Sequence, residues 1–394
     1  MTPQTKTCPI NQRGTIMKKQ MKLVLASILA AGCLFASGCN APAPSGSTSG
    51  SSTTVGVIMT GSSHDSGYNE AVADAAANLK KMSGVSVITA EQIPETNAVT
   101  DTMQQMADQG ATIIFATSYG YFKYALAFAK KHPDITVLHQ GGYQDGTFPA
   151  NFGTYWGAAY EPVALGGMAA GKATKTNKLG FVYAFPIAQS IANIDAFQLG
   201  AAMTNHDAKT YLVNTSSWCD PVKQKEAVNA LSAQGVDVFS QHQDCQTTVI
   251  QTAKAKNAKV VGYHYDASEL AGSSWLTGSA WNWTPVMKSI VTTVKQGKFK
   301  GSKYNANWIG TFANGDNPLE LASFGSSVDS ETRSAIKTEQ EKLSKKGASV
   351  FTGPIYCQDG TELVKAGEVA TYQDVNNFSC LVKGVVGTLP STSD

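Results

Sequence analysis

The sequence has little charge and lacks the patterns that mark several large classes of protein. Only 15% of its 394 residues are charged, against about one quarter in typical domains. Beyond the N-terminus no cluster of Lys and Arg stands out, so a nucleic-acid-binding surface is not expected. Neither Cys-x-x-Cys nor His-Glu-x-x-His occurs, which argues against zinc ribbons, thioredoxin-like centres and zinc proteases. We therefore expect no metal and no cofactor.

Long apolar runs are also missing after residue 38, where none approaches the ~18 residues of a transmembrane helix. The stretch 23–36 is apolar, follows three lysines and precedes small residues, which is the order of a secretory signal peptide. Cys39 ends an Ala-Ser-Gly-Cys sequence that resembles a bacterial lipobox, in which the cysteine is acylated. Cys33 is a second candidate, but the apolar run would continue past it.

These features predict an exported protein, lipid-anchored at Cys39 to the bacterial cell envelope. Residues 1–38 would be the leader, and residues 39–53, rich in Ser, Gly and Pro, a flexible tether. The soluble body would lie in the periplasm or outside the cell. Of the 31 basic residues, five lie in the leader with no acidic residue, which leaves 26 against 29 acidic residues, a net charge of −3. The positive charge of the whole chain therefore says nothing about an acidic partner.

From residue 54 onward, apolar β-rich runs alternate with helical patterns. The runs cover 55–59, 85–90, 111–118, 135–140, 179–185, 210–216, 236–241 and 259–265, and helical stretches separate them. This alternation predicts βαβ units and parallel sheets, arranged as two doubly wound lobes or as one (β/α)8 barrel. Residues 151–157 and 273–283 break the rhythm and are predicted to be irregular crossovers between lobes. The stretches 284–297 and 329–346 are predicted to be helical.

Aromatic and polar side chains gather where the predicted strands end. Open parallel sheets bind ligands at the carboxyl ends of their strands, and flat ligands need rings to stack on and a few directional polar groups. Ordinary loop composition is the alternative explanation. The predicted ligand-binding residues at these ends are Asp65, Tyr68, Asn69, Ser118, Tyr119, Phe185, Trp218, Asp244, His264 and Asp266.

Four cysteines remain outside the leader and the lipidation site. An even number in an exported chain predicts two disulfides, and four cysteines allow three pairings. We favour Cys219–Cys245 and Cys357–Cys380, because these cysteines are near each other in the sequence. Cys219 and Cys245 also each follow a strand on the same predicted sheet edge, which could bring them within bridging range. Four buried thiols are the alternative.

Eight short motifs together resemble the basic membrane protein family of bacterial substrate-binding lipoproteins, which serve ATP-driven importers. They are DSGYN (65–69), ATSYGY (116–121), AFPI (184–187), SWCDP (217–221), QHQD (241–244), WNW (281–283), TGPI (352–355) and KGVVG (383–387). The resemblance covers nearly all of residues 54–390, and it adds Trp281 to the predicted ligand-binding residues.

The resemblance implies a type I periplasmic-binding-protein fold, with two Rossmann-like lobes joined by a hinge of three crossovers. It therefore favours two lobes over the barrel. We expect one lobe from 54–155 with 283–325, and a second from 156–282 with 326–394. The ligands implied are purine bases or nucleosides. The family's aromatic residue that stacks on the base corresponds to Tyr68, and its adjacent asparagine to Asn69.

The sequence departs from the family at residues 262–266, Gly-Tyr-His-Tyr-Asp. The family usually has Gly-[Val/Tyr]-Asp-x-Asp there, and a carboxylate in this segment usually binds ribose hydroxyls. His264 replaces the first Asp, whereas the second is retained as Asp266. The loss of a carboxylate favours a free purine base over a nucleoside.

The sequence thus predicts a monomeric binding protein, and not an enzyme, that delivers a purine to an ABC permease. Tyr68 would stack on the ligand opposite Phe185 or Trp218, while Asn69, Asp244 and Asp266 read its edge.

Three alternative functions remain open. The first is ligand sensing without an importer, and the second is binding of another flat heterocycle such as thiamine. The third, a serine hydrolase, would use Ser118, but residues 116–120 are one Gly short of G-x-S-x-G and a matching His and acid are not evident. Metal binding by the His-x-Asp pairs at 242–244 and 264–266 lacks a supporting histidine cluster.

Overall fold

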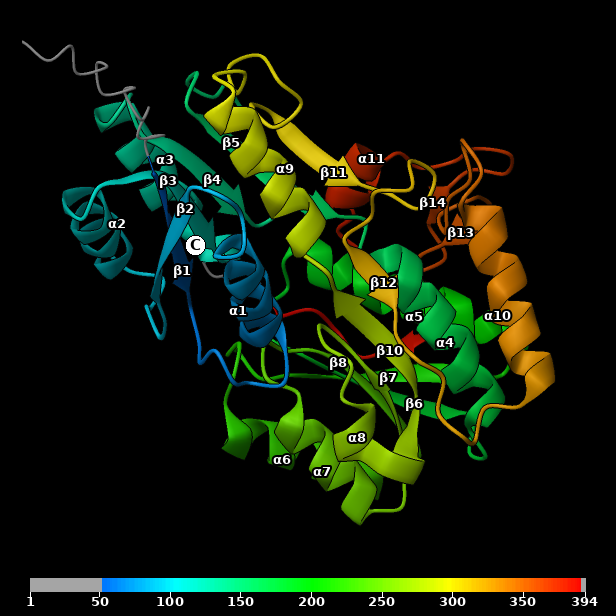
Figure 1. Ribbon diagram of the computed structural model, residues 1–394. Helices are drawn as coiled ribbons and strands as arrows, with labels where there is room; N and C mark the ends of the chain where they lie inside the picture. The colour runs from blue at the N-terminus through cyan, green and yellow to red at the C-terminus, as the bar shows by residue number, and fades with distance from the viewer. Residues whose placement is uncertain (1–51, 391–394) are drawn as a thin grey trace, which may run out of the picture. The chain divides into compact units, whose positions relative to one another are not determined.

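The computed structural model describes residues 52–390, so the predicted leader, the lipidation site Cys39 and most of the tether lie outside the described residues. Two large sheets organise the described chain (Figure 1). The first sheet is entirely parallel and has the order β11-β5-β4-β3-β1-β2. Its strands are β1 (Thr53–Met59), β2 (Val85–Ala90), β3 (Ala111–Thr117), β4 (Thr136–Gln140), β5 (Phe152–Gly157) and β11 (Asn307–Gly310).

The second sheet has the order β12-β10-β9-β8-β6-β7-β15, and only β12 at its edge runs antiparallel to its neighbour. A separate two-stranded sheet follows near the C-terminus. The strands are β6 (Lys178–Tyr183), β7 (Lys209–Asn214), β8 (Val238–His242), β9 (Lys259–Gly262), β10 (Trp275–Trp281), β12 (Leu319–Leu321), β15 (Val385–Val386), and the separate pair β13 (Ile355–Tyr356) and β14 (Glu362–Val364).

Helices cover both faces of each large sheet (Figure 1). Around the first sheet lie α1 (Tyr68–Leu79), α2 (Ala98–Asp108), α3 (Phe122–Lys131) and α9 (Thr284–Lys295). Around the second lie α4 (Tyr160–Ala173), α5 (Ala188–Thr204), α6 (Pro221–Ala233), α7 (Thr247–Ala255), α8 (Ser268–Ala271), α10 (Ser330–Leu343) and α11 (Tyr372–Asn376).

Strand β1 shows why a central strand can be a continuous apolar run. Val55 and Val57 pack into the core that contains α1, whereas Ile58 packs into the core between the sheet and helices α2 and α3. Successive side chains of a strand point to opposite faces. A parallel strand with helices on both sides therefore buries side chains on both of its faces, and a continuous apolar run results.

The chain passes between the two large sheets three times: from β5 to α4, from β10 to α9, and from β11 to β12. Each sheet with its helices is called a lobe below. The two-lobe type I arrangement predicted from the resemblance is confirmed, and a single closed barrel is excluded by the two separate sheets.

The two stretches predicted to be irregular crossovers are regular strands that lead up to the crossings. Most of 151–157 and of 273–283, predicted to be irregular, forms the buried strands β5 and β10. Their aromatic rings suit strands that pack on both faces, although they interrupt the aliphatic pattern used for the prediction. The segment 283–325, predicted to belong to the first lobe, ends in the second, because β12 pairs with β10.

Both predicted disulfides are confirmed. Cys219 and Cys245 join the loops after β7 and β8, and their Cα atoms are 5.3 Å apart. Cys357 and Cys380 close the C-terminal segment that carries β14 and α11, with Cα atoms 5.9 Å apart. The second disulfide thus fastens α11, which packs on α5, to the two-stranded sheet.

Replacing both Cys357 and Cys380 by Ser should lower the free energy of unfolding by about 3 kcal/mol. The disulfide spans 23 residues, and opening a loop of this size increases the conformational freedom of the unfolded chain. Urea denaturation of the oxidised proteins measures the difference. The single variants Cys357→Ser and Cys380→Ser serve as controls, since each already lacks the disulfide and should match the double variant. An unchanged midpoint would contradict the prediction.

Candidate ligand-binding site

Loops that follow the strands of the two lobes touch directly, so the lobes are closed on one another. The Tyr68 N–H donates to the carbonyl oxygen of Asp244 at 2.9 Å. Gln246 Nε2 donates to the carbonyl oxygen of Ser66 at 2.7 Å. Two further contacts between the lobes are Gln189 Nε2 to the Gly141 carbonyl at 2.6 Å and the Tyr265 hydroxyl to Asp74 at 3.1 Å. The candidate site is the region that these contacts enclose.

Gly67 makes the backbone contact between the lobes possible. A Cβ atom at this position would lie 1.8 Å from the carbonyl oxygen of Asp244. Its φ of −155° lies outside the left-handed region, so the close approach of Asp244 is the reason for a residue without a side chain here. Any larger residue would push Asp244 away from the Tyr68 N–H.

Asp65 and Asn69 build the loop that leads from β1 into α1. The Asp65 carboxylate accepts hydrogen bonds from the N–H groups of Gly67, Asn69 and Glu70 at 2.9–3.1 Å and from Asn69 Nδ2 at 2.7 Å. Asn69 Oδ1 accepts from the Gly61 N–H at 3.0 Å. A carboxylate at a helix start satisfies N–H groups that have no partner within the helix. In the closed structure these two predicted ligand contacts therefore hold the loop that positions Tyr68.

A cluster of aromatic rings brings together Tyr68, His264 and Trp281 of the predicted set. The ring centroids of Tyr68 and His264, which come from opposite lobes, are 5.2 Å apart. Two tryptophans that the sequence analysis missed complete this cluster. Trp156 lies 4.7 Å from Trp281, and Trp283 stacks on Trp281 at 4.2 Å with 15° between the planes. The aromatic composition of the two supposed crossovers was the signal for both.

The other predicted rings, Phe185 and Trp218, form an edge-to-face pair with centroids 5.0 Å apart. Trp218 approaches His242 at 5.9 Å, and His242 approaches His264 at 5.7 Å. His242 therefore connects this pair to the aromatic cluster around Tyr68. Burial lowers the pKa of His242 to about 3, so its imidazole is neutral at neutral pH.

Glu95 is a functional candidate that the sequence analysis missed. One carboxylate oxygen of Glu95 accepts a hydrogen bond from the Ser118 hydroxyl. The same oxygen accepts a second hydrogen bond from the Gly120 N–H, at 2.8 Å. The other accepts from Trp218 Nε1 of the opposite lobe at 3.2 Å. Glu95 follows β2, so the rule that placed the other residues at strand ends could have found it.

Ser118 does not form a nucleophilic pair with a histidine. Its hydroxyl bonds to Glu95, and His139 Nε2 lies 3.0 Å from the Ser118 carbonyl oxygen and not at the hydroxyl. Tyr119, next in the chain, is 37% exposed and is the most open of the predicted residues. Neither residue is arranged as in a hydrolase.

Asp244 and Asp266, both predicted to contact the ligand, have different surroundings. The Asp244 side chain is buried, and burial, with Asp65 and Glu95 nearby, raises its pKa well above the usual range. Asp266 accepts hydrogen bonds from the Ser268 N–H at 3.0 Å and the Ser323 hydroxyl at 2.6 Å. Its carboxylate thus fastens the segment after β12, so its predicted role in reading the ligand's edge has no support in these contacts.

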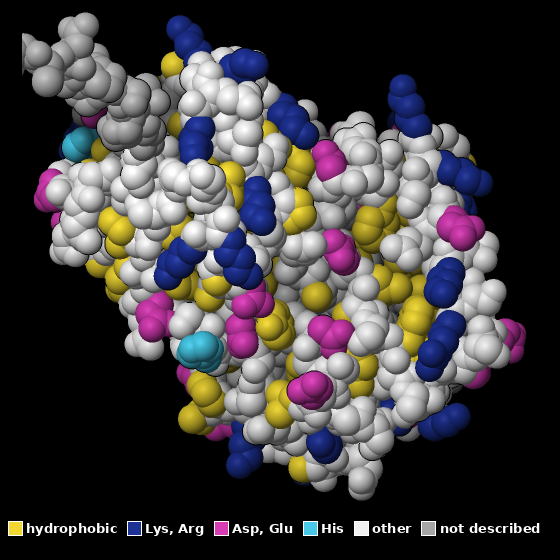
Figure 2. Space-filling model, in the orientation of Figure 1, with side chains coloured by type: hydrophobic (Ala, Val, Ile, Leu, Met, Phe, Trp, Pro, Cys, Tyr) yellow, Lys and Arg dark blue, Asp and Glu magenta, His cyan; other side chains and the backbone are white. Residues whose placement is uncertain are grey.

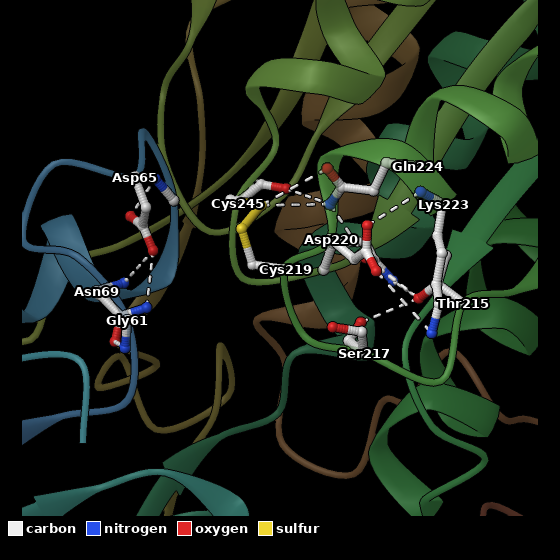
Figure 3. The surroundings of a disulfide bond; sticks show 12 residues. Gly61, Asp65, Asn69, Thr215, Ser217, Cys219, Asp220, Lys223, Gln224 and Cys245 are labelled. Carbon is white, nitrogen blue, oxygen red and sulfur yellow. Dashed lines mark hydrogen bonds and ion pairs between the residues drawn. A yellow bond between two sulfur atoms is a disulfide. The ribbon is translucent and has the colours of Figure 1, made fainter. Parts of the chain in front are cut away.

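The Cys219–Cys245 disulfide joins the loop that carries Trp218 to the loop that carries Asp244, and Figure 3 shows it beside Asp220 and Gln224. Asp220 caps α6 by accepting from the N–H groups of Val222 and Lys223 at 3.0 and 3.1 Å. The Asp244 N–H donates to the Trp218 carbonyl at 2.8 Å. Covalent and hydrogen bonds therefore fix the two loops that present Trp218 and Asp244.

The described residues show neither a metal site nor a membrane span. Within residues 52–390 no group of three His, Cys, Asp or Glu side chains could hold a metal ion. No helix in the same range is long and apolar enough to cross a bilayer. Lys and Arg side chains are spread over several elements of the face drawn in Figure 2.

Comparison with known proteins shows that the chain is similar to binding proteins of ABC transporters. Residues 52–310 match the model of a family described as ABC transporter substrate-binding protein, PnrA-like. A purine-binding protein of Brucella abortus is 31% identical over 85% of this chain and 93% of its own. A putative ABC transporter glucose-binding protein of Haloferax volcanii is 29% identical over 73% of this chain and 68% of its own.

A solved structure supports the fold. An ABC transporter solute-binding protein from Conexibacter woesei superposes with a TM-score of 0.60 and 19% identity, covering 74% of this chain and 96% of that one. At this identity the likeness concerns the fold alone.

Asp244→Asn should change how the stability of the protein depends on pH. Because the pKa of Asp244 is raised in the folded state, the folded protein keeps a proton that the unfolded chain loses above a pH of about 4. The wild type should therefore lose stability as the pH rises from about 4, by at most about 1.4 kcal/mol per pH unit from this group. The asparagine variant lacks this loss.

Urea denaturation between pH 4 and 7.5 measures the effect, with the exposed Asp207→Asn as the control. The curve for Asp244→Asn should diverge upward from the wild type with rising pH, whereas the control should stay parallel. Parallel curves for both variants would contradict the raised pKa.

Proposed function

Because the chain belongs to the family of PnrA-like ABC transporter substrate-binding proteins, we propose that it captures a purine between its lobes and delivers it to an ABC permease. The observation that carries the purine proposal is the approach of Tyr68 and His264 from opposite lobes, 5.2 Å apart, beside the buried carboxyl group of Asp244. Rings supply flat stacking surfaces, and the acid can accept from N–H groups on a base. The similarity to the Brucella purine-binding protein supports the same ligand class.

A free base fits the site better than a nucleoside. A ribose is commonly held by a carboxylate, which accepts from two hydroxyls at once. His264, buried and neutral, offers no such group. Asp266 already accepts from Ser268 and Ser323. Both positions therefore lack an uncommitted carboxylate for the sugar.

Binding requires the lobes to open. Beside the aromatic cluster, between Trp156, Gln189 and Tyr372, the packed lobes leave a cavity of only about 10 Å³, roughly the room for one water molecule. A purine thus enters when the three hinge crossings bend and the contacts between the lobes part. Closure excludes water and strengthens each polar contact with the base. The closed form would then be the one that docks on the permease.

The cellular setting belongs to the same proposal. The leader over 1–38 would direct export, and acylation of Cys39 would hold the monomeric body at the envelope beside its permease. Capture and release need no covalent chemistry. This agrees with Ser118, whose hydroxyl bonds to Glu95 and not to a histidine.

A thermal-shift panel tests the proposed function. The chain from residue 40 onward is unfolded, refolded and then tested with adenine, guanine, hypoxanthine, xanthine, their nucleosides, thiamine and glucose. A ligand at about 100 times its Kd adds roughly 2.7 kcal/mol of stability, which should raise Tm by a few degrees. We expect shifts with bases that exceed those with nucleosides.

The other outcomes of the panel contradict defined parts of the proposal. Shifts with nucleosides alone would overturn the preference for a free base. A shift with glucose or thiamine alone, or with no compound at all, would overturn the purine.

The ring of Tyr68 should account for a measurable part of the affinity. Tyr68→Leu removes the stacking surface and should weaken binding of the best purine about three- to tenfold. Tyr68→Phe keeps the ring and loses only the hydroxyl that contacts Gln140 Nε2, so it should stay within about twofold. Isothermal titration calorimetry measures both variants, after circular dichroism has shown that they are folded. Equal losses in the two variants would contradict the stacking role.

A further inference from the structure

One ring nitrogen of His264 is committed to a single partner. Trp281 Nε1 donates a hydrogen bond to His264 Nδ1 at 2.7 Å, and an indole nitrogen can only donate. Nδ1 must therefore carry a lone pair. A neutral imidazole has one N–H, so that hydrogen lies on Nε2. Trp281 thus fixes which tautomer His264 adopts.

The other ring nitrogen is a buried donor without a partner. Within residues 52–390, His264 Nε2 makes no hydrogen bond, and the side chain is only 1% exposed. Such groups are rare in folded proteins and costly to leave unpaired. Because His264 faces Tyr68 of the opposite lobe at 5.2 Å, this donor lies where the two lobes meet.

The surroundings of His264 keep its ring uncharged. Tyr68 of α1, His242 of β8, Trp281 of β10 and the adjacent Tyr263 approach it. Burial first, and then His242, lowers the pKa of His264 well below its ordinary value. A proton on Nδ1 would also confront the Trp281 N–H. The single N–H on Nε2 therefore persists over the neutral and mildly acidic range.

We propose that His264 is a specificity-determining donor, positioned by Trp281, which selects ligands that carry an exocyclic carbonyl oxygen. The inference rests on the proposed function, because it names which purines the same cleft takes: oxopurines. The ring centroid of His264 lies 3.9 Å from that of Tyr263 and 5.2 Å from that of Tyr68. Between such close rings, an oxygen that protrudes from a heterocycle reaches Nε2 more easily than a nitrogen within its edge.

The tautomer can be observed without any ligand. The ¹⁵N chemical shifts of histidine distinguish a protonated from a bare ring nitrogen, and the chain has six histidines, so His264→Asn identifies the signals of His264. We expect a bare Nδ1 and a protonated Nε2 in the wild type from pH 5 to 8. Trp281→Phe releases Nδ1, so both tautomers should appear and the ring should titrate at a higher pH.

Trp283→Phe is the matched control. Trp283 stacks on Trp281 and is buried, and its Nε1 has no partner among the described residues. Its replacement removes an indole from the same stack without removing a hydrogen bond. It should leave the His264 tautomer unchanged. A protonated Nδ1 in the wild type, or equal effects of the two variants, would overturn the role of Trp281.

Ligand pairs test the selection itself. Hypoxanthine differs from unsubstituted purine by a carbonyl oxygen and the N1–H that accompanies it, and the wild type should bind hypoxanthine at least about tenfold more tightly. His264 has a φ of +80°, which Asn and Asp tolerate better than most residues. His264→Asn keeps a donor and should keep part of this preference. His264→Gly also tolerates this backbone conformation and has no side-chain donor, so it should abolish the preference.

The failures of the two proposals are distinguishable by calorimetry. Equal binding of hypoxanthine and purine, or a preference that survives in His264→Gly, would overturn the donor role and leave the purine-binding function intact. If no purine binds, the proposed function and the oxopurine preference are both overturned. In that case the ¹⁵N spectra still decide whether Trp281 fixes the tautomer of His264.

Discussion

Among the hydrogen bonds that close the lobes, one joins backbone to backbone, from the Tyr68 N–H to the carbonyl oxygen of Asp244. Two backbones approach this closely only where no Cβ intervenes, and Gly67 provides that gap. The Asp65 carboxylate stabilises the same turn by accepting hydrogen bonds from three of its backbone N–H groups. The turn at the start of α1 therefore serves two purposes at once: it presents the Tyr68 ring, and it forms the surface against which the second lobe closes.

Around this contact aromatic rings and carboxyl groups are buried side by side. Burying carboxyl groups such as Asp244 is unfavourable unless they hold a proton or find a donor. The surrounding tryptophans and histidines exclude water and so increase that cost. A ligand with N–H groups would relieve it, which makes a closed cleft lined in this way more favourable with its ligand than without. The Cys219–Cys245 disulfide joins the two loops that carry Trp218 and Asp244 in the second lobe.

Much of this could be read from the sequence, since the strands and helices of both lobes followed from alternating apolar runs. The prediction failed at β5 and β10, where Tyr155, Trp156 and Trp281 replace aliphatic residues and hide the strand pattern. Strand-end logic identified Tyr68, His264 and Trp218, but it could not tell which way a side chain turns. Asp266 turns to Ser323, 57 residues farther along the chain. Glu95 follows β2, and the strand-end rule was not applied there; its contact with Trp218, 123 residues farther along the chain, appears only in the structure.

The bond between Glu95 and Trp218 has a consequence for observing the protein at work. It joins an indole of one lobe to a carboxylate of the other, so it exists only while the lobes are together. If the lobes separate, the indole N–H loses the Glu95 carboxylate as its hydrogen-bond acceptor and becomes exposed to water. Tryptophan emission responds to such a change of surroundings. The opening proposed above would therefore change the protein's own emission, which can be followed in real time without any attached dye.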